Sequence, residues 1–159
     1  MTLKITKERA EQCIKYIKDH LHISYDKDII IDFTAKYGEF IESAYNLVKT
    51  PLFYDKEPIH PDVKQIDFLN LDFDKFNKTF LSGLWFDEIH VIGSPPVDEV
   101  DEYIDAACNF AQSVSFIFPK NVSPYIFPPT YQCLFSTELD STTLFQIWIK
   151  TRSEERRVG

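Results

Sequence analysis

The sequence predicts an α/β protein built on a mostly parallel, doubly wound sheet. Short apolar runs rich in β-branched residues alternate with segments of helical spacing, which is typical of a parallel sheet covered by helices on both faces. The last two apolar runs are separated only by a polar turn at Asp140-Ser141-Thr142, so they must pair antiparallel. The prediction is a seven-stranded sheet with one antiparallel strand near the C-terminus.

The first half of the chain supplies two helices and three strands. Lys7 to Leu21 places apolar residues at spacings of three and four, which predicts an amphipathic helix with Thr6 as its N-cap. The run 29–33 is β-branched without alternation, as expected for a buried parallel strand. Helical spacing returns over 39–49, and further strands are predicted at 51–54 and 63–66.

The second half continues the alternation. A short helix is predicted over 73–80, a strand over 88–92, and a helix whose apolar face runs from Val100 to Ala111. A fifth strand over 113–118 is stopped by Pro119. The antiparallel pair is predicted over 131–136 and 144–150. Right-handed crossovers then bring the loops after the first four strands to one carboxyl edge of the sheet.

Length and composition indicate one domain, expected to span residues 1–151. Residues 152–159 resemble the in-frame translation of a sequencing adapter and are expected to be a non-native tail. The three cysteines, Cys13, Cys108 and Cys133, lie in apolar surroundings and are predicted to be reduced core residues of a cytoplasmic protein. No apolar run approaches the length that a bilayer requires, so no membrane association is expected.

Charge bears on the class of partner. The net charge of −8 argues against a broad electrostatic grip on nucleic acid, although a local basic patch or a protein partner stays open. An acidic helix start at Asp98, Glu99, Asp101, Glu102 and Asp105 would repel phosphate. His20 and His22 have no acid or cysteine at ligand spacing, and the isolated His90 is predicted to be packed, so no metal site is expected.

Polar residues follow four successive strand ends. Asp32 and Gly38 frame the first loop, a weak nucleotide-type signal. Asp55 ends the second strand, where a carboxylate can accept both ribose hydroxyls. Asp67 and Phe68 follow the third, placed to bind and flank an adenine. Gly93-Ser94-Pro95-Pro96 follows the fourth, and its two prolines fix φ twice and remove two donors. The competing interpretations are a helix-start carboxylate for Asp32, a solvated turn for Asp55 and a core position for Phe68.

In this order, the motifs resemble the amino methyltransferases of the N6-adenine/N4-cytosine type, and a compact DNA-methylase-like group within them. The resemblance covers about Ile5 to Thr151. It implies a Rossmann-like methyltransferase fold with S-adenosyl-L-methionine as cofactor, and it places Thr6 at the cofactor's carboxylate. The most specific match is 54–69, with Asp55 at the ribose and Asp67-Phe68 at the adenine. Asp32 to Phe40, including Gly38, resembles the glycine-rich cofactor loop.

The resemblance makes 94–97 the catalytic loop. An exocyclic amine is a poor nucleophile until its protons are accepted, a role that Ser94 Oγ and the Pro95 carbonyl could fill before Pro96 and Val97. The family's pattern usually has an aromatic residue where this chain has Val97, and stacking on a flipped base is worth about 1–3 kcal/mol. Bulky Ala35-Lys36-Tyr37 replaces small residues in the cofactor loop.

Three functions therefore stay open. The first is S-adenosylmethionine-dependent methylation of an exocyclic amine of a DNA or RNA base. The second is a catalytically degenerate domain that binds a protein partner. The third is methylation of a protein side-chain amide, which uses a similar Pro-Pro loop.

Overall fold

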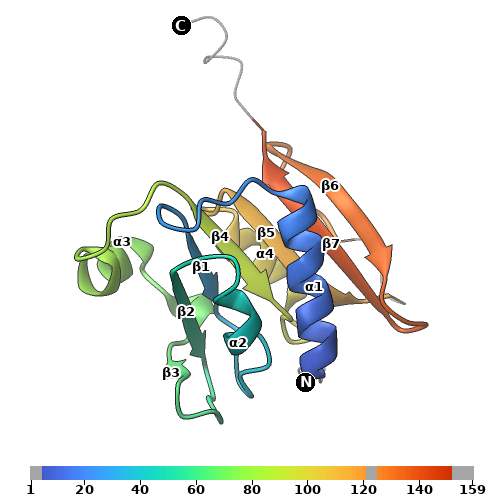
Figure 1. Cartoon of the computed structure of the whole chain (residues 1–159), viewed down its shortest axis with the longest axis horizontal. Coiled ribbons are helices and arrows are strands. Elements are labelled where there is room, and N and C mark those ends of the chain that lie inside the picture. The colour runs from blue at the N-terminus through green and yellow to red at the C-terminus, as the bar shows by residue number, and fades with distance from the viewer. Residues whose placement is uncertain (1–4, 121–124, 152–159) are drawn as a thin grey trace, which may run out of the picture.

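The computed structural model describes residues 5–120 and 125–151, which form a seven-stranded sheet between two layers of helices. The spatial order of the strands is β3-β2-β1-β4-β5-β7-β6, as Figure 1 shows. Their bounds are β1 (Ile29–Asp32), β2 (Thr50–Asp55), β3 (Lys64–Gln65), β4 (Ile89–Gly93), β5 (Ser113–Pro119), β6 (Tyr131–Glu138) and β7 (Thr143–Lys150).

One strand runs against the others, as predicted. β1 pairs in parallel with β2 and β4, and β4 pairs in parallel with β5. β7 is antiparallel to both β5 and β6. Its register follows from the tight turn after β6, where Asp140 Oδ1 accepts from the backbone N–H groups of Thr142 and Thr143. The carboxyl ends of β1, β2 and β4 therefore lie on one edge.

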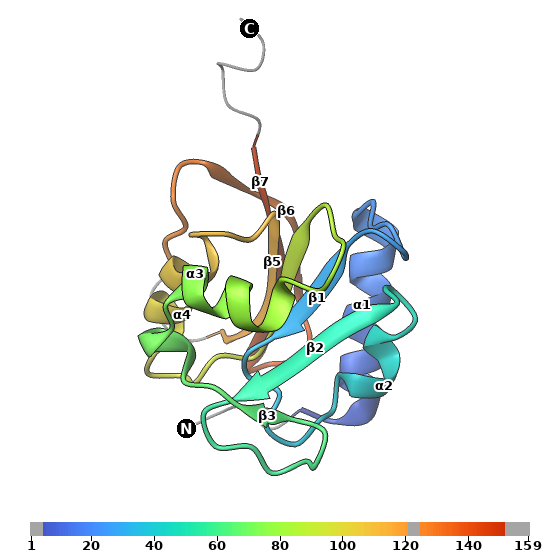
Figure 2. The ribbon, with the colours of Figure 1, turned by 90° about the vertical axis from the view of Figure 1, so that its left-hand side faces the viewer.

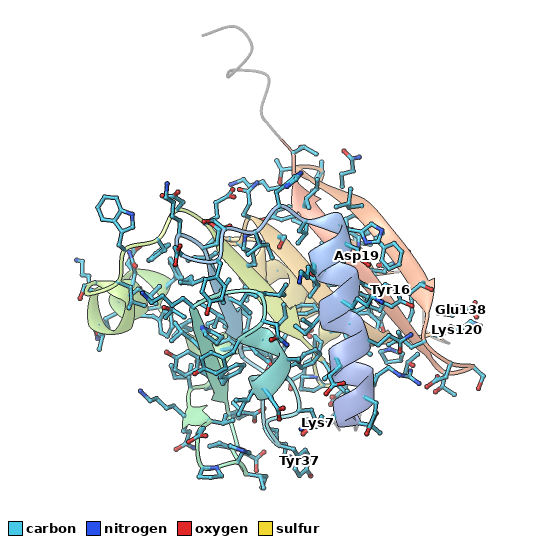
Figure 3. All side chains as sticks on the ribbon, viewed as in Figure 1. Lys7, Tyr16, Asp19, Tyr37, Lys120 and Glu138 are labelled. Atoms are coloured by element: carbon cyan, nitrogen blue, oxygen red, sulfur yellow. The ribbon has the colours of Figure 1, made fainter. Side chains whose placement is uncertain are left out.

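Helices cover both faces, and Figure 2 shows α1 and α2 on one side of the sheet and α3 and α4 on the other. α1 (Lys7–His20) begins at its predicted N-cap, because Thr6 Oγ1 accepts from Arg9 N at 3.1 Å. Its Tyr16 ring stacks on Phe145 of β7, and Figure 3 shows Tyr16 pointing from α1 toward that strand. The other face packs against η1 (Phe68–Asn70), α3 (Phe73–Phe76), η2 (Asn77–Leu81) and α4 (Val100–Ala107).

Three predicted elements are shorter in the structure. α2 spans only Ile41–Ala44, because turn-type bonds such as Asn46 N to Ser43 O replace the helical pattern and Ser and Asn compete for backbone groups. β3 has two exposed residues, since it lies at the sheet edge. α4 ends at Ala107, although Ala111 is buried as predicted.

The cysteine prediction needs one correction. All three thiols are free, but Cys133 is exposed on the edge strand β6 and is no core residue. Cys13 is buried and Cys108 half-buried, and burial raises the pKa of each to about 12. Across the described residues, no helix combines the length and apolarity that a membrane crossing needs. The predicted non-native tail, 152–159, lies outside the described residues.

Candidate functional site

A cleft of about 190 Å³ opens at the carboxyl edge of the sheet. It is bordered by the loops after β1, β2 and β4, so three of the four loops converge there as predicted. Its walls are Thr34, Lys36, Asp55, Lys56, Glu57, Pro96, Asp98, Glu99 and Tyr103. In sheets of this type, ligands bind outside the carboxyl ends of the strands.

Asp32 ends β1 and is 1% exposed. It does not line the cleft, but it is hydrogen-bonded to Thr34, which does. Its Oδ1 accepts from Thr34 N at 2.7 Å and from Thr34 Oγ1 at 2.9 Å. Its Oδ2 is buried without a hydrogen bond within the described residues. Burial, against the lowering effect of the Thr34 bonds, raises the pKa of this carboxyl to about 7, and the nearby Asp55 and Glu39 charges add to the increase.

Gly93 and Ser94 approach Asp32 from β4. Gly93 has a φ of +148°, and a Cβ there would come within 2.2 Å of Thr34 Oγ1 and 2.8 Å of Asp32 Oδ1. Only glycine fits this close approach. Ser94 N donates to Thr34 Oγ1 at 2.8 Å, while Ser94 Oγ is buried without a hydrogen bond within the described chain.

Thr34 is therefore the link that sequence reasoning missed. Its hydroxyl donates to Asp32 and accepts from the Ser94 backbone, so it joins the ends of β1 and β4. A hydroxyl two residues after an aspartate is a local turn signal. Nothing local indicates that the same hydroxyl reaches a residue 60 positions away.

Asp55 faces the cleft from the end of β2. Its Oδ2 accepts from Lys36 N at 3.1 Å and its Oδ1 from Glu57 N at 2.8 Å. Since an ionised carboxylate has about four lone-pair sites, each oxygen retains capacity for one more donor. The geometry ties the loop after β1 to the loop after β2.

Gly38 does not line the cleft. It has a φ of +80°, and a Cβ there would come within 2.7 Å of the His60 ring. The backbone N–H groups of Ile59 and His60 both donate to Lys36 O at 2.9 Å. The loop after β2 thus covers the glycine loop, and Tyr37, 48% exposed, is displaced to the surface at the end where α1 begins (Figure 3).

Asp67 and Phe68 also lie apart from the cleft. Phe68 is 2% exposed and stacks on Phe33, with ring centroids 4.1 Å apart, so its ring belongs to the core cluster. Asp67 Oδ2 accepts from Asn70 Nδ2 at 2.7 Å. Asp67 borders a second pocket of about 450 Å³ against α3 and η2.

The remaining predicted residues divide between the cleft and its surroundings. Pro96 lines the cleft, and its carbonyl accepts from Glu99 N at 3.0 Å. Ser94 and Pro95 are buried and Val97 is half-buried, and none of the three borders the cleft. Thr6 lies near the end of β5, beside Ile117, with its hydroxyl used in capping α1.

The cleft is predominantly acidic. Four carboxylate residues and two lysines line it. Tyr103 also lines the cleft, although the sequence predicted it only as part of the apolar face of a helix, and it is 4% exposed. Burial raises the pKa of its hydroxyl above the usual value, and the Glu99, Asp55, Asp67 and Asp32 charges raise it further. This field favours a cationic ligand and opposes a phosphate.

Comparison with known proteins bears on the fold. No protein-family model matches the chain, and neither does any curated protein sequence. Among solved structures it is similar to HI0767 from Haemophilus influenzae, provisionally described as a methylase (TM-score 0.59, 12% identity, 90% of this chain, 88% of that one). It is also similar to the 23S rRNA methyltransferase ErmE (TM-score 0.60, 8% identity, 97% of this chain, 71% of that one).

A third similar structure is yhhF from Escherichia coli, provisionally described as a methyltransferase (TM-score 0.59, 11% identity, 95% of this chain, 89% of that one). Identities this low bear on the fold alone. Together with the strand order and the single reversed strand, these similarities confirm the prediction that the chain has a Rossmann-like methyltransferase fold.

Proposed function

We propose that this protein is an S-adenosyl-L-methionine-dependent methyltransferase that acts on an amino or amide nitrogen. One observation carries the proposal. Among the described residues, five buried side-chain oxygens have no hydrogen bond, and two of them, Asp32 Oδ2 and Ser94 Oγ, lie at the carboxyl ends of the two central strands. Buried polar groups without partners are costly, and a catalytic or ligand-binding role is one explanation for them.

The donor chemistry of the cleft fits the cofactor. Asp55 faces the cleft with acceptor capacity for ribose hydroxyls, and the acidic walls suit a ligand that carries a sulfonium and an ammonium group. Asp32 is the acceptor for one of these cationic groups. Since the pKa of Asp32 is about 7, its charge and the cofactor affinity are both expected to increase from pH 6 to pH 8.

The volume of the cleft fits the cofactor less well than its chemistry does. The cleft of about 190 Å³ is smaller than the range of about 300–1,000 Å³ in which ligand pockets usually fall. Cofactor binding therefore requires the cleft to widen, and we propose that the loop after β2 moves outward at the expense of the bonds of Ile59 and His60 to Lys36 O. These are two backbone hydrogen bonds, worth about 1 kcal/mol each.

Ser94 is the proposed acceptor for the target nitrogen. The cofactor, when bound, supplies an electrophilic methyl group on its sulfonium. Ser94 Oγ accepts a hydrogen bond from one N–H of the target amine, and the Pro95 carbonyl accepts a hydrogen bond from the other N–H. Pro95 and Pro96 hold this loop rigid, so the chain's contribution is mainly positioning. Val97 offers no stacking face, and weak binding of the target is expected.

The proposed target is an exocyclic amine of a nucleic-acid base, on the strength of the Ser-Pro-Pro loop. ErmE, an rRNA methyltransferase with the same fold, is compatible with this class. The acidic cleft favours a second candidate, a protein side-chain amide, because Asp98 and Glu99 border the site and oppose a phosphate backbone. The small volume of the cleft is also compatible with the third alternative, a catalytically degenerate domain that binds a protein partner.

The first experiment is calorimetric titration of S-adenosylmethionine into the protein, with two variants. Asp55→Ala removes a cleft carboxylate, whereas Asp62→Ala removes an exposed carboxylate of the same loop outside the cleft. Micromolar binding that only Asp55→Ala abolishes is expected. No binding to the unaltered protein contradicts the proposal and leaves the degenerate domain.

The second experiment assigns the target class. Protein with methyl-labelled cofactor is incubated with DNA, RNA and protein pools, and label is counted in each. Label in nucleic acid supports the base, and label in protein supports the amide. Ser94→Ala is expected to reduce transfer at least about 100-fold, the effect of losing one preorganised hydrogen-bonding group. Transfer unchanged by Ser94→Ala contradicts the role of this residue.

A further inference from the structure

A second cluster of polar side chains lies at the opposite, amino edge of the sheet. Asp28 precedes β1, Glu88 precedes β4, and His90 is the second residue of β4. One ligand atom from each lies within 4.8 Å of the other two. These residues are up to 62 positions apart in the chain and meet only because β1 and β4 are neighbours.

A hydrogen bond from the neighbouring strand β5 fixes the orientation of the His90 ring. Its Nδ1 lies 2.7 Å from Ser113 Oγ on β5, and its Nε2 lies 3.1 Å from Asp28 Oδ2. Metal-binding histidines usually donate their second ring N–H to a polar partner, which fixes the tautomer. Without a metal, the 3.1 Å contact requires a proton between Nε2 and Asp28 Oδ2. A metal ion would take the place of that proton, with Nδ1–H then donated to Ser113 Oγ.

Burial and backbone bonding make the cluster rigid. His90 is 3% exposed and Asp28 is 5% exposed. Ile29 N donates to Glu88 O at 3.0 Å, and Ser24 N donates to Asp28 Oδ2 at 3.1 Å. Glu88 is half-buried, which leaves access from solvent. Ser24 also lines a surface pocket of about 470 Å³, so Asp28 is bonded directly to the wall of that pocket.

We propose that Asp28, Glu88 and His90 bind a divalent transition-metal ion of the zinc class. One imidazole nitrogen and two carboxylate oxygens are ligands that Zn²⁺ accepts at about 2.0–2.2 Å, which corresponds to ligand atoms about 3.4 Å apart. The Asp28–His90 pair, at 3.1 Å, is close to this spacing, and the Glu88 oxygen, within 4.8 Å of both, would have to move closer to complete it. Binding requires Nε2 without a proton, so any proton on Nε2 is released to solvent.

The site lies at the end of the sheet remote from the cleft, so its expected role is structural. The ion would join the starts of β1 and β4, with β5 held through Ser113. A ligand that binds only the folded state increases stability by mass action. At a zinc concentration about 100 times Kd, the expected increase in Tm is about 5–10 °C.

The test is calorimetric titration of ZnCl₂ into the full chain, with Tm measured in parallel. Removing the buried His90 is expected to destabilise the fold, so the diagnostic variant is Glu88→Gln, which keeps the size and removes the charge of the most accessible ligand. One zinc per chain is expected, with binding at least about 10-fold weaker in Glu88→Gln. The matched control is His22→Gln with Cys133→Ser, two exposed groups outside the cluster: Cys133 lies on β6, and His22 lines the pocket that Ser24 also borders.

Spectroscopy tests the same proposal independently. ¹⁵N NMR of the His90 ring is expected to show Nδ1 protonated and Nε2 shifted on addition of zinc. Absence of zinc binding to the unaltered chain overturns the proposal. So does binding that Glu88→Gln leaves unchanged, binding that the His22 and Cys133 control abolishes, or a His90 ring whose resonances do not respond.

Discussion

At the amino edge of the sheet, the buried His90 has a polar partner at each ring nitrogen, whereas at the carboxyl edge Asp32 Oδ2 and Ser94 Oγ have none among the described residues. The same strands, β1 and β4, supply both sets of groups. Because leaving a buried polar group unpaired costs about 1–3 kcal/mol, the carboxyl edge carries an energetic deficit that the amino edge avoids. We infer that the two edges serve different purposes, with the proposed cofactor site at the carboxyl edge and a structural role, which the proposed metal ion would strengthen, at the amino edge.

The largest expected effect comes from breaking the paired edge. His90→Ala leaves the buried Asp28 carboxylate without its imidazole and opens a cavity between β1 and β5, so we expect a loss of about 4 kcal/mol in the free energy of unfolding. Urea denaturation at pH 7 in the presence of a chelator measures it. Ser113→Ala, which removes only the Nδ1 contact, should cost about 1–2 kcal/mol. Equal losses in both variants would contradict this ranking.

The next effect tests how tightly the carboxyl edge is packed. Gly93→Ala forces a side chain into a positive φ and against Thr34 Oγ1 and Asp32 Oδ1, with an expected cost of about 3 kcal/mol. Gly83→Ala is the matched control, since a Cβ there meets nothing within 4 Å. Thermal unfolding of both variants provides the comparison. A tolerated Gly93→Ala would mean that the two strand ends are not in close contact.

A smaller effect concerns the charge of Asp32. In the native state its pKa is about 7, against 3.8 as the ordinary value, so between these pH values the folded chain holds a proton that the unfolded chain has lost. The free energy of unfolding therefore decreases as pH rises from about 4 to 7, and the effect of Asp32 on it is constant above pH 7. Asp32→Asn removes this dependence, and its gain over the unaltered protein should increase with pH.

The expected gain for Asp32→Asn at pH 8 is about 2 kcal/mol, within the limit of about 4 kcal/mol set by about 1.4 kcal/mol per pKa unit. Denaturant unfolding of both proteins at pH 4, 6 and 8 measures it. The same variant should lose cofactor affinity, so stability and binding move in opposite directions. A gain independent of pH would show that Asp32 is charged in the native state throughout.

The smallest expected change in stability is that of Ser94→Ala. The hydroxyl has no hydrogen bond to lose within the described residues, so we expect the free energy of unfolding to change by less than about 1 kcal/mol. Methyl transfer, in contrast, should largely disappear. A loss of several kcal/mol in thermal unfolding would identify Ser94 as a structural residue and remove the contrast between the two edges.

Much of the fold could be predicted because its signals are local. The helical spacing and N-cap of 6–20, the β-branched run at 29–32 and the polar turn at 140–142 each act within a few residues. The candidate site was predicted less completely. The positions of Asp32, Asp55 and Ser94 at strand ends follow from the order of elements, but the displacement of Phe68 into the core follows from its stacking on Phe33, 35 positions away.

The sequence by itself determined the order of strands and helices, the single reversed strand and the acidic residues at the strand ends, because propensity, periodicity and turn chemistry are properties of short segments. Only the tertiary structure decided that His60 covers Gly38, that Thr34 joins Asp32 to Ser94, and that Asp28 meets His90. Apart from the local bond between Thr34 and Asp32, these contacts join residues 22 or more positions apart. Such contacts depend on which strands become neighbours, and strand neighbours are selected by packing of the whole sheet against its helices.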